Sequence, residues 1–318
     1  MESAPTAPKT AAGETAAPGT AEPAATLGWS VGMPALLVFL WSTGFIGAKY
    51  GLPYAEPFTF VSIRFAIAGS IFAGLALIGG APWPRTPREW INTAVVGVLL
   101  HGVYLTAVFI AIHRGTPAWV AALLTGIHPL LTALTAGWTL GERIRPLQWL
   151  GFVLGLGGIG LILWRTGSGG AALTGIGLAA CTVGLFSLTS GTLFQKRFGA
   201  ATDLRSGQAV QQLAAFLVVL PCAFLFETRE VQWTGEFIFA LAWLTGALSM
   251  GMFTILYTMI RKGAASQVAS LFYLVPPTVA VEGFFLFDEV MSLKQVIGMV
   301  LAGVGVALVT RSPKVRSG

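Results

Sequence analysis

Long apolar runs follow one another along almost the whole chain, and short polar segments separate them. A helix needs roughly 20 mostly apolar residues to cross the hydrocarbon core of a bilayer. The first five runs cover residues 31–50, 58–78, 90–112, 117–140 and 147–164. The second five cover residues 172–194, 208–226, 237–260, 264–286 and 293–310. The pattern therefore predicts an all-α membrane protein with ten transmembrane helices.

Composition supports this class. Of 318 residues, 55% are hydrophobic and only 10% are charged, whereas soluble globular domains carry about 25% charged residues. Most of the surface is therefore expected to face lipid.

The two ends of the chain are predicted to be tails. Residues 1–30, rich in Ala, Pro and Thr, are predicted to be a disordered tail, and residues 312–318 form a short C-terminal tail. Cys181 and Cys222 lie inside apolar runs, so they give no disulfide framework.

The lysines and arginines alternate with the predicted spans. Basic residues mark cytoplasmic loops of membrane proteins, which also accounts for the positive net charge without nucleic acid as a partner. Five basic residues fall in one set of loops: Lys49, Arg114, Arg165, Arg229 and Lys294. Thirteen fall in the tails and the other set: Lys9, Arg85, Arg88, Arg143, Arg145, Lys196, Arg197, Arg205, Arg261, Lys262, Arg311, Lys314 and Arg316. Both termini are therefore predicted to be cytoplasmic.

The two halves of the chain, residues 31–166 and 167–311, match each other at a nearly fixed offset. The pairs include Ser42/Ser190, Gly51/Gly199, Thr106/Thr254, Pro129/Pro277, Glu142/Glu289 and Gln148/Gln295. Shared hydrophobicity does not place glycine, proline and glutamine in register. Because five is an odd number, the second half is predicted to be inverted relative to the first. Inverted repeats around a central site are a frequent architecture of secondary transporters, and neither a membrane enzyme nor an anchor requires them.

Several short motifs carry a family resemblance. They are Trp41-Ser42-Thr43-Gly44-Phe45, Lys49-Tyr50-Gly51, Pro57, Arg64-Phe65, and Gly141-Glu142 with Gln148 and Gly151. In this order they resemble the drug/metabolite transporter superfamily, in its ten-helix EamA-type members, over residues 31 to 311. The second half departs from the pattern at Asp288-Glu289-Val290. The resemblance implies an exporter of metabolites in the bacterial inner membrane, with amino acids among the commonest substrates and the aromatic amino-acid exporters as one branch.

Polar side chains at membrane depth are costly, so they are candidates for function. Helix position places eight of them near the midplane as a predicted substrate site: Trp41, Ser42, His101, Tyr104, His128, Ser187, Tyr257 and Tyr273. Each has a structural alternative, because histidines can bond neighbouring helices and serines often allow close helix packing. Pro129 and Pro277 are predicted kinks at matching positions of the two halves.

Arg64 and Glu282 are full charges inside the spans, both predicted in the outer third, and Lys49 ends the first span on the same side. We expect Glu282 to neutralise Arg64 or Lys49 as part of an extracellular gate, the alternative being that each reaches the surface separately.

The predicted midplane contains no Lys, Arg, Asp or Glu. A substrate with several phosphates is therefore disfavoured, and a neutral or zwitterionic metabolite, such as an aromatic or bulky hydrophobic amino acid, is favoured. Transport is expected to be uncoupled from protons, unless a histidine carries the proton. A proton-coupled drug exporter, a channel and a membrane-embedded enzyme are the alternative functions.

Other motifs carry no chemistry. Residues 155–160 match G-x-G-x-x-G, but that pattern binds dinucleotides only between a strand and a helix. Gly151 and Gly155, like Gly298 and Ala302, instead form small-residue faces for helix packing, either within the chain or between two protomers of a homodimer. No phosphate loop, HExxH motif or Cys/His cluster is present, so no cofactor or metal is predicted.

Overall fold

The computed structural model describes residues 32–140, 146–163, 174–198, 202–252, 254–255, 258–259 and 271–310. The first half contains α2 (Met33–Gly51), α3 (Pro57–Ile78), α4 (Pro87–Gly97), η2 (Val98–Val103), α5 (Tyr104–His113), α6 (Ala118–Gly126), α7 (His128–Leu140) and α8 (Pro146–Leu163). The second half contains α9 (Gly175–Phe198), α10 (Leu204–Phe226), α11 (Gly235–Ala242), η3 (Trp243–Met252), η4 (Phe272–Leu274), α14 (Val275–Phe287) and α15 (Leu293–Thr310). Segments η2 and η3 are π-helical, and η4 is a 3₁₀ turn.

Eight helices within the described ranges are long and apolar enough to cross a membrane: Pro57–Ile78, Pro87–His113, Ala118–Thr135, Pro146–Leu163, Gly175–Phe198, Leu204–Phe226, Gly235–Met252 and Leu293–Thr310. Helix α2 has 19 residues, and Phe272–Phe287 is a shorter apolar stretch. The prediction of an all-helical membrane protein is therefore confirmed, and each of the eight helices overlaps one predicted span.

Polar residues and prolines fix where several helices begin. Thr86 accepts a hydrogen bond from the Glu89 amide at 3.2 Å and caps α4, and Thr234 caps α11 in the same way. Such caps satisfy backbone donors that the first turn leaves unpaired.

The predicted kink positions stand beside helix breaks. The fourth span is interrupted at Ile127, between α6 and α7, and Pro129 is the second residue of α7. Pro277 lies in the first turn of α14, directly after η4. A proline lacks the amide that would continue the helical hydrogen bonds, and the fourth span consists of two shorter helices, α6 and α7.

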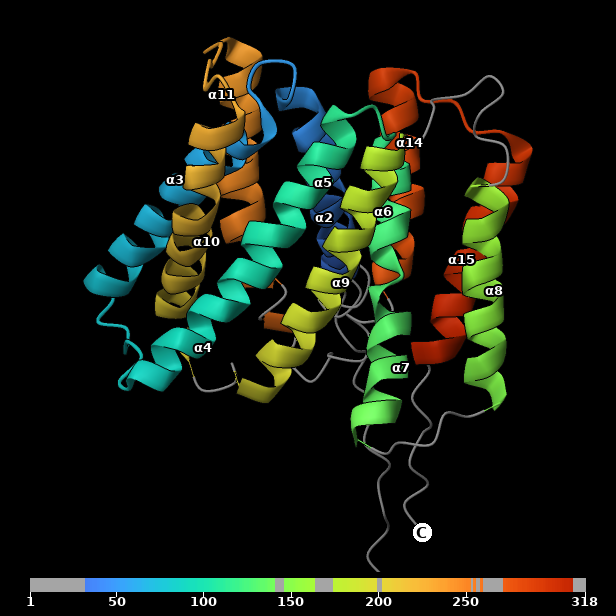
Figure 1. Ribbon diagram of the computed structural model, residues 1–318, viewed down its shortest axis with the longest axis horizontal. Helices are drawn as coiled ribbons and strands as arrows, with labels where there is room; N and C mark the ends of the chain where they lie inside the picture. The colour runs from blue at the N-terminus through green and yellow to red at the C-terminus, as the bar shows by residue number, and fades with distance from the viewer. Residues whose placement is uncertain are drawn as a thin grey trace, which may run out of the picture.

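Helix α8 packs along α15, and α3 packs along α10. Figure 1 shows the α8–α15 pair at one side of the bundle and the α3–α10 pair at the other, with α2, α5, α6 and α9 between them. At the α8–α15 contact, a Cβ added to Gly158 would meet the Gly298 carbonyl oxygen at 2.4 Å. The small-residue faces therefore pack against each other within one chain, and the contacts of the described residues give no support to the homodimer alternative.

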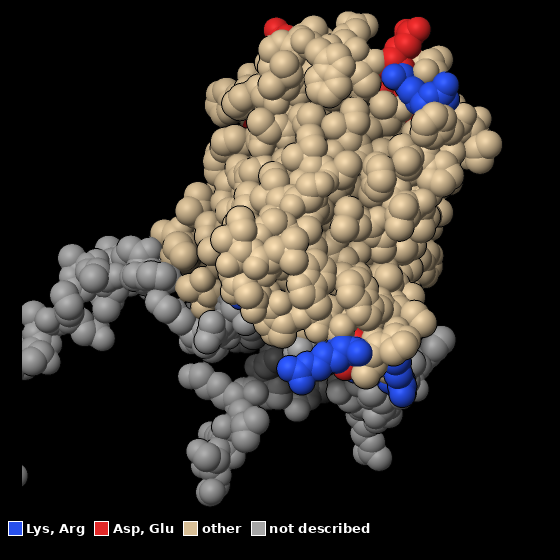
Figure 2. All heavy atoms as spheres, turned by 90° about the vertical axis from the view of Figure 1, so that its left-hand side faces the viewer, with Lys and Arg blue, Asp and Glu red and all other residues tan. Residues whose placement is uncertain are grey.

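The outer surface of the bundle is apolar. Large hydrophobic side chains are exposed on many helices, among them Leu156, Phe186, Leu217, Phe285 and Val300. On the face drawn in Figure 2, charged side chains gather at the two ends and are absent from the middle. This distribution is that of a protein whose middle faces lipid and whose ends face water.

Candidate functional site

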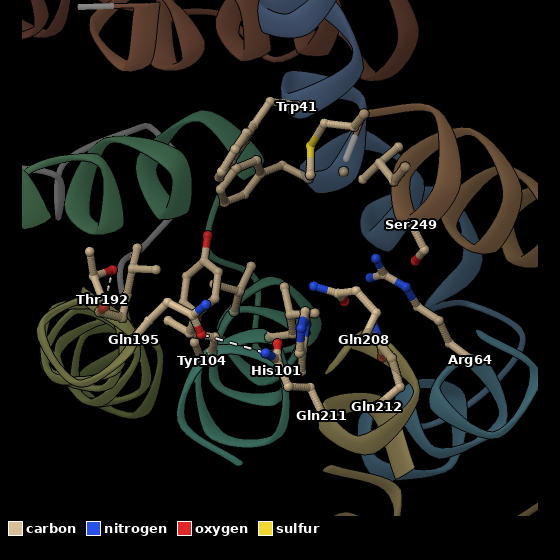
Figure 3. Close-up of a pocket in the computed structure, with 18 of the residues that line it drawn as sticks. Trp41, Arg64, His101, Tyr104, Thr192, Gln195, Gln208, Gln211, Gln212 and Ser249 are labelled. Atoms are coloured by element: carbon tan, nitrogen blue, oxygen red, sulfur yellow. Dashed lines mark hydrogen bonds between the residues drawn. The ribbon is translucent and has the colours of Figure 1, made fainter. Parts of the chain in front are cut away.

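A cavity of about 440 Å³ lies in the bundle, lined by residues from both halves of the chain. Its polar lining consists of Arg64, His101, Tyr104, His128, Thr192, Gln195, Gln208, Gln211, Gln212 and Ser249. Figure 3 labels all of these side chains except His128, and shows Trp41 on one side of the space and Arg64 with Gln208 on another. The cavity is therefore amphipathic, with separate aromatic and polar walls.

The aromatic wall is held by contacts between three elements. The ring of Trp41 on α2 meets Phe272 of η4 edge to face, with 4.4 Å between centroids. His128, the first residue of α7, meets the same Phe272 at 5.5 Å. Edge-to-face contacts of this kind are favourable for aromatic rings. The break in the fourth span at Ile127 places His128 at this wall.

The polar wall comes mainly from α10. Gln208, Gln211 and Gln212 recur at a spacing that places them on one helical face, and all three are buried. The Gln211 amide donates to Gln195 Oε1 on α9 at 3.5 Å. Asp203 accepts a hydrogen bond from the Arg205 amide at 2.9 Å and caps the start of α10. The glutamines are therefore presented by the first turns of an ordered, capped helix.

Close backbone approach brings α4 and η2 against α10. A Cβ added to Gly97 would meet the backbone oxygen of Gln211 at 2.3 Å, so only glycine fits there. The following segment, η2, carries His101, and Tyr104 begins α5 one turn later. Both side chains are buried and line the cavity. The contact of Gly97 with α10 therefore positions two of the predicted site residues, His101 and Tyr104, beside the glutamines.

Four of the eight residues predicted to bind substrate line the cavity: Trp41, His101, Tyr104 and His128. The Ser42 hydroxyl oxygen instead lies within hydrogen-bond distance of two acceptors, Phe39 O and Glu282 Oε1, at 2.7 Å each. Ser187 donates to the Leu99 carbonyl at 2.8 Å and joins α9 to η2. Tyr273 lines a separate small cavity next to Pro276 and Pro277, and Tyr257 lies outside the described residues.

The predicted gate charges have other neighbours than expected. Lys49 forms an ion pair with Glu289, not with Glu282, and its ammonium lies 4.5 Å from the centroid of the Phe287 ring. Glu282 bonds Ser42, near the middle of α2, so a carboxylate does reach the middle of a span. Arg64 is in the cavity wall. Among the described residues, the expected pairing of Glu282 with Lys49 or Arg64 is therefore not present, and the expectation of a midplane without a carboxylate is corrected, while the gate role of these charges stays a prediction.

A second set of contacts joins loops at the end of the bundle where α2 ends and α3 begins. The Glu227 carboxylate accepts hydrogen bonds from the Phe58 and Thr59 amides, each at 2.7 Å, and so caps α3. Glu56 accepts from the amide and hydroxyl of Thr228, also at 2.7 Å. The hydroxyl bond from Thr228 holds the pKa of Glu56 below its ordinary value. These contacts link the α2–α3 loop to the α10–α11 loop (Figure 1).

The sequence analysis missed the glutamines, Thr192 and Ser249. A signal for the glutamines was present, because three amides share one face at the start of an otherwise apolar span. Among the described residues, no group of three or more His, Cys, Asp or Glu could hold a metal ion. The site is therefore suited to binding by amides, one guanidinium and aromatic rings.

Comparison with known proteins gives concordant results. The chain is 26% identical to "Uncharacterized inner membrane transporter YedA" of Escherichia coli (strain K12), over 77% of this chain and 78% of that protein. It is 25% identical to "Uncharacterized transporter YvbV" of Bacillus subtilis (strain 168), over 88% and 91%. It is 23% identical to "Probable amino-acid metabolite efflux pump" of Escherichia coli (strain K12), over 85% and 91%.

A solved structure titled "Crystal structure of protein" aligns with a TM-score of 0.61 and 21% identity, over 88% of this chain and 96% of that chain, which establishes a shared fold. The EamA-like transporter family matches the sequence twice, over residues 28–164 and 175–311. The named relatives are transporters and not enzymes. This chain is a multi-pass membrane protein that belongs to the EamA-like transporter family, within the drug/metabolite transporter superfamily.

Proposed function

We propose that this transporter exports small metabolites by alternating access, with aromatic or bulky hydrophobic amino acids as the leading class. The observation that carries the proposal is the amphipathic cavity, to which both halves contribute. Its volume of about 440 Å³ lies within the range of small-molecule sites. Trp41 and Phe272 offer an apolar side chain an aromatic surface, and the glutamines offer polar groups hydrogen bonds. The relative named as an amino-acid metabolite efflux pump supports this class.

We further infer that α2 and the stretch Phe272–Phe287 complete ten spans, arranged as two inverted five-helix repeats with cytoplasmic termini. The separate family matches in each half support two repeats, and the distribution of basic residues supports the orientation.

The cavity also indicates a conformational state. Its lining reaches Gln195 near the end of α9 and Leu204 at the start of α10, toward the predicted cytoplasmic side. At the opposite end, the Lys49–Glu289 ion pair and the Glu227 cap connect helices of the two halves. We assign this arrangement to a state closed on the outer side, which must separate these contacts to release substrate outward.

Counterflow in liposomes tests the proposal. The purified protein is reconstituted without any ion gradient, and uptake of a panel of radiolabelled amino acids is measured. We expect saturable accumulation of aromatic or bulky apolar amino acids. Uptake should be lost in Trp41→Ala and His101→Ala, because both side chains line the cavity. A channel would pass solute without saturation.

Two residues that are exposed on the surface of the bundle, away from the cavity, provide matched controls. Trp149 and His113 are exposed, so Trp149→Ala and His113→Ala should transport like the unmodified protein. Absence of counterflow for every amino acid would remove the amino-acid proposal, and equal loss in the controls would show that the cavity variants report only on stability.

The contact between Glu282 and Ser42 favours a second candidate, proton-coupled export. A carboxylate bonded near the middle of a span at 2.7 Å is suited to carry a proton across during the transport cycle. In that case an imposed proton gradient should accelerate transport strongly, and Glu282→Gln should abolish the acceleration while counterflow persists. Transport that is indifferent to the gradient would leave the uncoupled mechanism.

A further inference from the structure

Arg64 is a buried cation in the wall of the cavity. It is the eighth of the 22 residues of α3, only 6% of the residue is exposed, and it lines the cavity. Figure 3 shows the guanidinium pointing into the space beside the amide of Gln208. Neither of the ion pairs within the described part of the chain includes Arg64.

An arginine in this position needs a physical explanation. Its guanidinium stays protonated in proteins, and arginine is rarely buried unless it is paired. Removing a charge from water without a partner is strongly unfavourable. Inside a membrane protein, a charge that faces a cavity can be compensated by an ion that enters the cavity. The forked geometry of a guanidinium fits a carboxylate through two parallel hydrogen bonds.

The rest of the lining defines which ion fits. Among the described residues, the cavity wall contains no Asp or Glu, so an ammonium group has no carboxylate to bind there. Arg64 is also the only lysine or arginine in that described lining, which suits one negative charge better than the several charges of a polyphosphate. Trp41, on another side of the cavity in Figure 3, offers its ring to the apolar part of the ligand.

We propose that Arg64 binds the carboxylate of the substrate, and that the cavity accepts apolar and aromatic monocarboxylates whether or not they carry an amino group. The inference rests on the proposed function, of which amino acids are then one subclass. It extends the expected neutral or zwitterionic substrates to monocarboxylates without an amino group, and it assigns to Arg64 a binding role.

Binding of three ligands that share one phenyl-alkyl scaffold tests the assignment. Phenylalanine carries both charged groups, 3-phenylpropionate only the carboxylate, and phenethylamine only the ammonium. Their binding to the purified protein in detergent is measured by calorimetry at neutral pH. We expect 3-phenylpropionate to bind at least as tightly as phenylalanine, and phenethylamine to bind at least about tenfold more weakly, as expected for loss of a hydrogen bond to a charged group. Equal binding of the amine and the carboxylate would overturn the proposal.

Variants locate the effect. Arg64→Gln should weaken binding of 3-phenylpropionate at least about tenfold, whereas Arg64→Lys should retain part of the affinity as a point charge without the fork. Arg88 is exposed at the start of α4, so Arg88→Gln is the matched control and should bind like the unmodified protein. Unchanged carboxylate binding in Arg64→Gln would contradict the assignment. If that variant does not fold, the ligand series on the unmodified protein decides alone.

The two proposals fail separately. Saturable counterflow of amino acids without any preference for the carboxylate would leave the transport proposal intact and overturn the role of Arg64. Carboxylate binding that depends on Arg64, without counterflow of any amino acid, would leave the binding site intact and remove the proposed transport of amino acids. Absence of carboxylate binding to the unmodified protein would overturn the inference directly.

Discussion

At the scale of single residues, Glu289 has an unusual number of neighbours for a carboxylate in a turn. It forms the ion pair with Lys49 at the end of α2, and its Oε1 also accepts a hydrogen bond from the Ala118 amide, at the start of α6, at 3.3 Å. The Glu289 side chain is only 9% exposed, so solvent screens the pair little. One carboxylate therefore connects the α14–α15 turn to two helices of the first half.

The substitution Glu289→Gln tests how much this connection stabilises the protein. It keeps the size of the side chain but leaves the Lys49 ammonium without its partner. We expect the free energy of unfolding to fall by about 1–3 kcal/mol, as for a hydrogen bond to a charged group in a partly buried site. Thermal unfolding of the purified protein in detergent measures the change. The control is Glu230→Gln in an exposed loop; equal unfolding temperatures of the two variants would contradict the prediction.

Residue depth could be predicted from the sequence better than residue direction. Counting along each helix placed Trp41, His101, Tyr104 and His128 near the midplane, and all four line the cavity. The same counting cannot say which side of a helix faces the cavity, because lipid and protein interior are both apolar and leave little amphipathic pattern in a buried span. Arg64 was assigned to a gate from its predicted depth in the outer third, and nothing in the pattern indicated that its side chain lines the cavity.

At the scale of elements, the α8–α15 contact predicts how two adjacent glycines of α8 differ in their effect on stability. A Cβ at Gly158 would meet Gly298 O at 2.4 Å and Ala302 N at 2.7 Å, whereas a Cβ at Gly157 would meet nothing within 4 Å. Gly158→Ala should therefore lower the free energy of unfolding by about 1–3 kcal/mol through overpacking. Gly157→Ala should leave it unchanged or raise it by up to about 1 kcal/mol, because alanine favours helix more than glycine does.

Thermal unfolding of both glycine variants under identical conditions measures this difference. Similar unfolding behaviour of the two variants would mean that α8 and α15 do not pack through this face.

The presence of a small-residue face could be predicted from the spacing of Gly151 and Gly155 alone. Its partner could not be read, because the same spacing serves contacts within a chain and contacts between protomers. The π-helical segments η2 and η3 were also not predicted, because the apolar pattern of a span does not distinguish a π-helix from an α-helix.

At the scale of the whole molecule, the distribution of lysines and arginines among the loops predicts which loops lie on each side of the membrane. The residue Arg85 lies in the α3–α4 loop and Glu230 in the α10–α11 loop, and both are exposed. In the background Cys181→Ala, Cys222→Ala, a cysteine at position 230 should react with a membrane-impermeant maleimide on intact cells. A cysteine at position 85 should react only after the cells are opened, because the basic loops are expected to be cytoplasmic.

The reverse labelling pattern would invert the proposed orientation, and labelling of both positions from outside would contradict an odd number of spans between them. The orientation itself stays a prediction from the sequence. The charge alternation and the internal repeat involve many residues each, so an error at any one position, such as the departure at Asp288, does not change the result.

The burial of Arg64 also has a consequence for synthesis. A charged residue at the centre of a helix costs about 2.5–3.5 kcal/mol on membrane insertion, a cost that the apolar remainder of α3 must offset. The glutamines that surround the cavity with it belong to α9 and α10, which the ribosome makes much later. Until those helices arrive, the nascent first half holds an uncovered charge in the bilayer. We therefore expect a chain truncated after α8 to be degraded faster than the full chain, and not to act as a half-size carrier.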